Sequence, residues 1–205
     1  KNVSPLVIVF LMSSMLAGAA FAGSVGADDY TCVGTSQDDS ADTENYNDYL
    51  QTIYGRENGI PGGCANDIAQ TNDGVLWFGT YGGLYRYNGS EFKWMDGYES
   101  VKTVNCLYKD EEGRLWIGTN DNGISIIIND TLANVISKED GLAADSVRCI
   151  TQSTDGDYYV GTTGELSIVT LAGGLSVKST VHDITYARCI DAASNGDVAV
   201  VTDKG

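Results

Sequence analysis

Two arginines are the most notable candidates for binding chemistry in this chain of 205 residues. The sequence has 28 acidic and 12 basic residues and a formal net charge of −16, so cations are scarce. Arg148 and Arg188 nevertheless occur at matching points of two similar segments. A pair of guanidinium groups can bind a carboxylate or a phosphate through paired hydrogen bonds. The alternative is that both arginines only form salt bridges with neighbouring carboxylates, as exposed arginines often do.

Other polar side chains could orient a small ligand together with these arginines. They are amides, one carboxylate and one phenol, and they recur at two points of a repeated segment. The complete set of candidate ligand-binding residues is Tyr81, Asn120, Asp121, Asn122, Arg148, Arg188, Asn66 and Asn105.

Recognisable catalytic and metal-binding motifs are absent from the sequence. It contains no Gly-x-Ser-x-Gly, no phosphate loop, no metalloprotease helix and no Cys/His cluster suited to zinc. The sole histidine, His182, has no catalytic partner motif nearby, so we expect it in a surface loop. A pair of glycosidase carboxylates stays open because carboxylates are plentiful, although in an acidic chain most of them form a solvated face. We expect no catalytic residue, metal or cofactor in this chain.

The candidate ligand residues belong to a unit that the chain repeats. Each unit has an Asp-Gly, Glu-Gly or Asn-Gly turn between two apolar runs, where glycine supplies the positive φ of a tight hairpin. The turn glycines Gly74, Gly113, Gly156 and Gly196 are separated by 39, 43 and 40 residues. A period near 40 with short strands is typical of a four-stranded propeller blade. We therefore expect an all-β fold, a β-propeller with about three and a half blades of an incomplete ring.

The spacing also predicts the blades and the position of the ligand residues. Alternate loops of every blade gather on one rim of such a ring, and the eight candidates fall in the loops after the second strands or at the entries to the first strands. Residues 49 to 54 are a candidate outer strand for the last blade. A β-solenoid is the competing repeat fold, but its rungs are shorter than about 30 residues. The expected blades lie near residues 66–97, 104–137, 147–180 and 187–205, the last of them truncated.

The residues inside the units resemble those of a known family. Asn66-Asp67-Ile68, Asp73-Gly74-Val75-Leu76-Trp77-Phe78-Gly79-Thr80 and Gly83-Leu84-Tyr85-Arg86-Tyr87 resemble the two-component-regulator propeller repeat, and Leu115-Trp116-Ile117-Gly118-Thr119 with Gly123-Ile124 is similar. Glu57-Asn58-Gly59-Ile60-Pro61 is similar to that family's connector between blades. The resemblance covers about residues 49–205 and is weakest in the fourth unit, where Ala199 and Val201 replace Trp and Gly.

The resemblance implies the ligand-sensing, extracytoplasmic region of a membrane-spanning signalling protein. The output module, a histidine kinase or a diguanylate cyclase, is expected beyond this sequence, so we expect the chain to be the N-terminal piece of a longer protein. The expected partners are a small-molecule ligand, such as a saccharide or its breakdown product, and a second copy in a homodimer of the full-length protein. The alternatives are a secreted propeller enzyme, either a lyase or a glycosidase, and a scaffold that binds proteins.

The first residues predict export. Lys1 precedes the apolar run of residues 6–11, and small residues end at Ala20-Phe21-Ala22, which is typical of a secretory signal cleaved after Ala22. The alternative for residues 1–27 is a membrane anchor helix. The acidic stretch 28–48 is predicted to be a solvated linker before the repeats of 49–205. Either reading places the repeats on the extracellular or periplasmic face of the cytoplasmic membrane.

The charge limits the classes of partner. A net charge of −16 argues against nucleic acid, whose binding depends on a basic surface, and against adsorption to anionic lipid. Contact with a membrane is therefore expected only through the N-terminal segment or a downstream helix.

Cysteine and tryptophan residues have mainly structural interpretations. Cys106, Cys149 and Cys189 share one slot of successive repeats, where neighbouring blades should hold them too far apart to bridge, so we expect buried free thiols. A disulfide between Cys32 and Cys64 stays open. Trp77 and Trp116 occupy matching strand positions and are expected to fill the gaps between blades rather than to stack on a ligand.

Overall fold

The computed structural model describes residues 6–7, 50–51, 54, 58–60 and 65–203. The chain divides into two compact units, residues 1–54 and 55–205. In the first unit β1 (Leu6–Val7) pairs in parallel with β2 (Leu50–Gln51). Of the strand expected within residues 49–54, the structure describes Leu50–Gln51 as β2, and its assignment to the last blade of the ring stays a prediction. The linker 28–48, most of the N-terminal segment, Cys32 and Cys64 lie outside the described residues.

None of the helices in the described ranges has the length and the apolar character required to cross a membrane.

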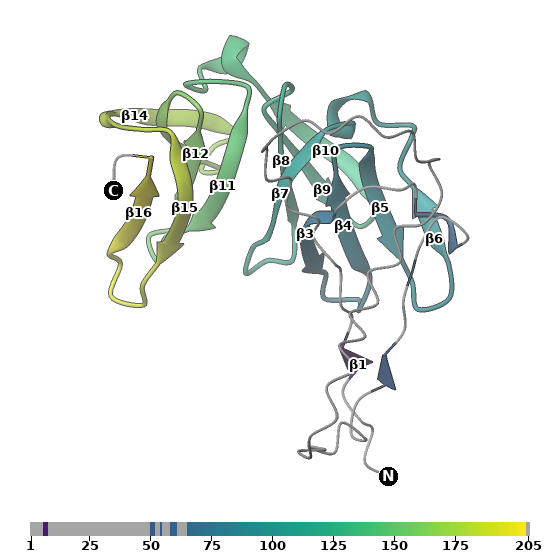
Figure 1. Ribbon diagram of the computed structural model, residues 1–205. Coiled ribbons are helices and arrows are strands. Elements are labelled where there is room, and N and C mark those ends of the chain that lie inside the picture. The colour runs from purple at the N-terminus through teal and green to yellow at the C-terminus, as the bar shows by residue number, and fades with distance from the viewer. Residues whose placement is uncertain (1–5, 8–49, 52–53, 55–57, 61–64, 204–205) are drawn as a thin grey trace, which may run out of the picture. The chain divides into compact units, whose positions relative to one another are not determined.

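The second unit contains three four-stranded antiparallel sheets and one two-stranded sheet, each made of consecutive strands (Figure 1). We call these sheets blades 1 to 4, and the β-propeller expected from the repeat is confirmed. Blade 1 consists of β3 (Ala65–Gln70), β4 (Leu76–Thr80), β5 (Gly83–Tyr87) and β6 (Phe92–Trp94). Blade 2 consists of β7 (Val104–Lys109), β8 (Leu115–Thr119), β9 (Ile124–Ile128) and β10 (Thr131–Ile136). Blade 3 consists of β11 (Val147–Gln152), β12 (Tyr158–Thr162), β13 (Glu165–Thr170) and β14 (Ser176–Thr185), and blade 4 of β15 (Ala187–Ala192) and β16 (Val198–Thr202).

Blade 3 differs from the prediction in its outer strand. The blade expected to end near residue 180 continues to Thr185, because its outer strand β14 runs over ten residues that include several β-branched side chains. His182 consequently lies in β14 and not in a loop. The pairing of β13 with β14 moves from Glu165 opposite Thr185 to Leu166 opposite Val181, so His182 is one of three residues that bulge out of the ladder. Its side chain is exposed, as expected.

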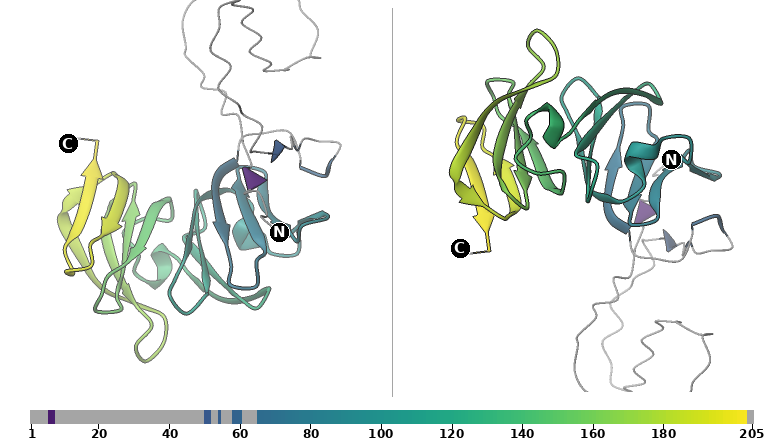
Figure 2. Two further views of the ribbon diagram at one scale, coloured as in Figure 1. Left: turned by 90° about the horizontal axis from the view of Figure 1, so that it is seen from below. Right: turned by 90° about the horizontal axis from the view of Figure 1, so that it is seen from above.

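The inner strands set the order of the blades. The first strands of consecutive blades lie side by side, in the order β3, β7, β11 and β15. The remaining strands of each blade extend away from them (Figure 2). Two short 3-10 helices, η3 (Glu99–Val101) and η4 (Lys138–Asp140), precede blades 2 and 3. Ala65 at the start of β3 pairs with Thr80 at the end of β4, and the other blades repeat this register. In all four blades the entry to the first strand and the turn after the second strand therefore lie at the same edge.

The gaps between blades are filled by large side chains, as the sequence predicts. Trp77 and Trp116 are only 1% and 0% exposed. Trp77 packs with Leu115 of the next blade in one apolar cluster, and Trp116 stacks on Tyr158, which occupies the same slot as Leu115 one blade later. The second strands also leave room for close contact: a Cβ at Gly118 would lie 2.7 Å from Cγ1 of Val147. These contacts fix how consecutive blades align.

Candidate functional site

Four of the candidate ligand residues occupy one structural slot. The first strand of every blade contains a β-bulge directly after its entry, where the register with the second strand shifts by one residue. A bulge changes the direction of a side chain and is frequent beside functional sites. The residues in the four bulges, in chain order, are Asn66, Asn105, Arg148 and Arg188.

The two asparagines in this slot form hydrogen bonds between consecutive blades. The side-chain amide of Asn66 donates a hydrogen bond to the carbonyl of Val104 at 2.7 Å, and that of Asn105 donates one to Val147 at 2.9 Å. Both acceptors are at the entry of the following blade. The amide donors of Asn66 and Asn105 are thus directed at the backbone of the next blade, and a role of these residues in ligand binding stays a prediction.

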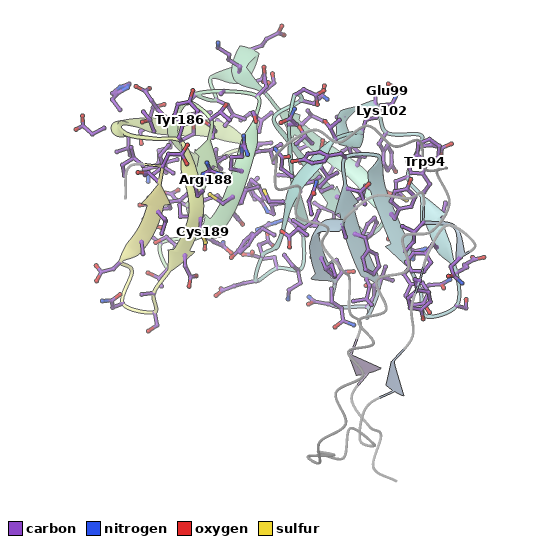
Figure 3. All side chains as sticks on the ribbon, in the orientation of Figure 1. Trp94, Glu99, Lys102, Tyr186, Arg188 and Cys189 are labelled. Carbon is purple, nitrogen blue, oxygen red and sulfur yellow. The ribbon has the colours of Figure 1, made fainter. Side chains whose placement is uncertain are left out.

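The two arginines in the same slot differ from each other. Arg188 is exposed and forms an ion pair with Asp203, which follows the second strand of its own blade. This is the alternative that the sequence left open for Arg188. Arg148 is also exposed, and its guanidinium forms no ion pair with the described residues. Tyr186, Arg188 and Cys189 follow one another from the entry end of β15 (Figure 3).

The turn of blade 2 brings the remaining polar candidates together. Asn120, Asp121 and Asn122 are consecutive, and Asn122 Nδ2 donates to Asp121 Oδ1 at 2.8 Å. The hydroxyl of Thr103 donates to Asp121, and the hydroxyl of Ser146 lies 3.4 Å from Asn120 Oδ1. Thr103 and Ser146 precede the first strands of blades 2 and 3, so this group spans two blades. We call these five residues the polar rim.

Tyr81 is the counterpart of Asn120 in blade 1. It is 64% exposed. Trp94 on β6 is 49% exposed (Figure 3), and its indole nitrogen would lie 2.7 Å from a Cβ placed on Gly83, in the turn that contains Tyr81. The rim of blade 1 thus presents aromatic side chains where the rim of blade 2 presents amides and a carboxylate.

A repeated hydroxyl fixes the shape of these turns. Thr119 Oγ1 donates to the carbonyl of Gly123 at 2.9 Å and accepts a hydrogen bond from the backbone N–H of Asn122 at the same distance. Thr80 in blade 1 makes the corresponding bonds. Such hydroxyl-to-backbone bonds stabilise turns. The polar side chains of the rim are therefore carried on backbone whose conformation is set locally.

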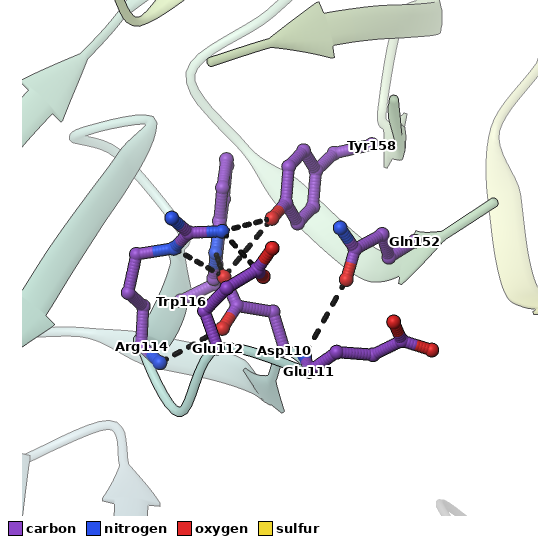
Figure 4. A network of polar contacts seen from close by, with 7 residues as sticks. All are labelled: Asp110, Glu111, Glu112, Arg114, Trp116, Gln152 and Tyr158. Atoms are coloured by element: carbon purple, nitrogen blue, oxygen red, sulfur yellow. Dashed lines mark hydrogen bonds and ion pairs between the residues drawn. The ribbon is translucent and has the colours of Figure 1, made fainter. Parts of the chain in front are cut away.

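A second polar group lies at the hairpins on the opposite edge and joins blades 2 and 3 (Figure 4). The buried carboxylate of Asp110 accepts hydrogen bonds from Trp116 Nε1 at 2.9 Å, from Arg114 Nε at 2.6 Å and from the hydroxyl of Tyr158 at 3.0 Å. Burial by itself would raise the pKa of Asp110, but these hydrogen bonds outweigh it and lower the pKa below its ordinary value. Burial raises the pKa of Tyr158, and its bond to Asp110 adds to the effect.

Sequence reasoning missed Thr103, Ser146 and this buried group. The repeat itself could have identified Asp110, because Asp110 and Thr71 each lie six residues before the tryptophan of their blade, Trp116 and Trp77. Thr71 accepts the indole hydrogen bond of Trp77 at 3.0 Å, as Asp110 does from Trp116. Thr103 and Ser146 could have been found as the residues that precede the first strands.

The three aligned cysteines are free, as predicted, but only one of them is buried. Cys106 is buried, Cys149 is half-buried and Cys189 is exposed. Burial raises the pKa of the Cys106 thiol, with the neighbouring Asp67 and Cys149 contributing, and burial raises that of Cys149 to about 11. Among the described residues no group of three or more His, Cys, Asp or Glu side chains is arranged to bind a metal ion. The raised pKa values favour the protonated thiols of Cys106 and Cys149 at neutral pH.

Comparison with known proteins assigns the repeat. Residues 59–82 and 98–121 match the family model described as two component regulator propeller. These segments are two component regulator propeller repeats. The first repeat ends in the turn of Tyr81, and the second contains Thr103, Asn105, Asn120 and Asp121. No curated protein sequence matches the chain.

Solved structures share the fold of this chain. One is the extracellular domain of a protein described as a hybrid two component system of B. thetaiotaomicron, with a TM-score of 0.59 and 17% identity over 72% of this chain. The chain spans 23% of the length of that domain. Streptogramin B lyase has a TM-score of 0.53 and 17% identity, covering 70% of this chain and 49% of the lyase. The WD40 β-propeller domain of Doa1 has a TM-score of 0.55 and 16% identity, covering 69% of this chain and 48% of that domain.

Proposed function

We propose that residues 65–203 belong to the ligand-sensing, extracytoplasmic propeller region of a membrane-spanning signalling protein. The observation that carries the proposal is the match of residues 59–82 and 98–121, which include the first two strands of blades 1 and 2, to the two component regulator propeller repeat. The fold alone does not select this function, since a lyase and a WD40 domain share it. The solved extracellular domain of a hybrid two component system with the same fold agrees with the proposal.

The polar rim supplies the binding chemistry of this sensor. It presents hydroxyl, amide and carboxylate groups from two neighbouring blades within hydrogen-bonding reach of one another. Groups of this kind orient a small polar ligand such as a saccharide when they converge on one mouth. The exposed ring of Tyr81 extends the same edge with an apolar surface.

Signalling would follow from a change in how blades are held. A ligand shifts an equilibrium between two arrangements only by its difference in affinity for them. Because Asn120 belongs to blade 2 and Ser146 precedes blade 3, a ligand that contacts both side chains favours the arrangement in which these blades are correctly spaced. That preference would pass along the packed inner strands to an output module, a kinase or a cyclase.

A reporter experiment in cells tests the proposal. The full-length protein would be coupled to a reporter of its output and treated with a mixture of oligosaccharides from partially hydrolysed polysaccharides. The double variant Asn120→Ala/Asp121→Ala should lose at least about tenfold of its sensitivity, as expected when charge-assisted and neutral hydrogen bonds to a ligand are removed. The matched control is Asp155→Ala, which removes an exposed carboxylate from a hairpin at the opposite edge. An unchanged response of the rim variant, or an equal loss in the control, would contradict a sensing role for the polar rim.

A further inference from the structure

The residue in the bulge slot changes character halfway along the chain. In blades 1 and 2 it is an asparagine that donates to the entry of the next blade. In blades 3 and 4 it is an arginine, and among the described residues Arg148 makes no such hydrogen bond to the entry of blade 4. At Arg148 the exchange gives up a bond between blades, and the two arginines are at corresponding points of the adjacent inner strands β11 and β15. A local rule that is broken in this way commonly marks a functional position.

Arg148 differs from the other described arginines in its lack of an ion pair. Arg86 forms an ion pair with Asp130 at 2.7 Å, Arg114 forms one with Asp110 at 2.6 Å, and Arg188 pairs with Asp203. Only Arg148, of the arginines in the described ranges, lacks a carboxylate partner, although the whole chain carries a net charge of −16. Its five N–H donors are therefore available at the rim, and they match the geometry of an oxyanion.

We propose that Arg148 and Arg188 bind the oxyanion of a small ligand, a carboxylate or a phosphate, at the entry end of β11 and β15. Asp203 forms an ion pair with Arg188 when no ligand is bound, and the oxyanion of the ligand competes with Asp203 for this guanidinium. The proposal deepens the proposed function by naming the chemical class of the ligand, and it rests on that function for its role in signalling. The negative charge of the remaining surface keeps general anion binding weak, so that affinity depends on these two side chains.

The backbone beside Arg188 supports a site at this place. Tyr186 has φ 52°, a left-handed conformation that is uncommon for a bulky aromatic residue. Its N–H donates to the carbonyl of Gly164 at 3.0 Å, which holds the strand entry against the turn of blade 3. The ring of Tyr186 is 54% exposed next to the arginine slot (Figure 3). Strained residues of this kind cluster at ligand sites, and the exposed ring offers a face for the rest of the ligand.

Titration calorimetry with inorganic phosphate and, separately, with succinate tests the site in the full-length protein at pH 7.5 and constant ionic strength. Saturable binding of either probe is expected, and the probe that binds identifies the oxyanion. Arg148→Gln should weaken this binding by about tenfold or more, the effect of losing charged hydrogen bonds. Asp203→Asn should strengthen it several-fold because Arg188 is released. Lys93→Gln, which removes an exposed cation from β6 in blade 1, should leave the affinity unchanged.

Three results would overturn the inference. They are an absence of saturable binding of both anions, a loss in Lys93→Gln as large as that in Arg148→Gln, and an unchanged or lower affinity in Asp203→Asn. Thermal unfolding of each variant verifies that these exposed substitutions leave the fold intact. The outcome is separate from that of the reporter experiment: anion binding without an output response retains the site and contradicts the sensing function, and an output response without anion binding does the reverse.

Discussion

The indole ring of Trp116 stacks on the phenol ring of Tyr158, with the ring centroids 3.8 Å apart and the planes inclined by 24°. The two residues are on the second strands of blades 2 and 3. Both donate a hydrogen bond to the same carboxylate oxygen, Oδ2 of Asp110. One stacked pair and one buried carboxylate therefore align blade 3 on blade 2 at the edge opposite the polar rim.

Removing the charge of Asp110 should destabilise the protein and flatten its acid response. The folded state lowers the pKa of this carboxylate, so its contribution is fully present above the unfolded pKa near 4 and disappears as the pH falls through the folded pKa. Asp110→Asn should cost about 1–3 kcal/mol at pH 7. Urea unfolding of the full-length protein between pH 7 and the acid limit of its folded state measures both effects.

The control for Asp110 is Glu112→Gln. Glu112 Oε2 lies 2.7 Å from Nη2 of Arg114, the arginine that also pairs with Asp110, but the side chain of Glu112 is 58% exposed. Its loss should cost less than about 1 kcal/mol, as for other exposed ion pairs. Equal costs for the two variants would mean that burial does not distinguish these carboxylates.

Asn105 should matter for stability and not for ligand binding. Asn105→Ala leaves the carbonyl of Val147 without its side-chain donor and should lower the free energy of unfolding by about 1 kcal/mol. Asn134→Ala, an exposed position on β10, is the matched control and should have little effect. Chemical denaturation and phosphate titration on the same samples separate the two roles, and a weakened phosphate affinity with unaltered unfolding would instead assign Asn105 to ligand binding.

Gly118 should not tolerate a side chain. A Cβ at this position would lie 2.4 Å from Sγ of Cys106 and 2.7 Å from Cγ1 of Val147. Gly118→Ala should therefore cost about 1–3 kcal/mol through overpacking, and adding Cys106→Ala should recover part of the loss. Gly97→Ala is the control, since a Cβ there meets open space and its φ is not positive. A stable Gly118→Ala variant would show that the blades are not in close contact at this point. Thermal unfolding provides the comparison.

The sequence predicts the strands better than the partners of individual side chains. Turn glycines such as Gly113 and the apolar runs around them define the blades locally, which is why the order of elements agrees with the structure. The role of Asn66 depends on a bulge that directs its amide at Val104, 38 residues away. His182 was misplaced because a strand that bulges has no simple alternating pattern. Features that depend on the neighbouring blade are thus hidden in a single repeat.

The close packing of consecutive blades is most directly tested by a double-mutant cycle on Trp116 and Tyr158 in the full-length protein. Trp116→Ala alone should lower the free energy of unfolding by about 3–5 kcal/mol, because a large buried side chain is removed. With Tyr158→Ala as the second change, the account predicts a coupling energy of about 0.5–1.5 kcal/mol, as found for stacked aromatic pairs. Two losses that simply add, with no coupling, would contradict the arrangement of these repeats as blades packed face to face.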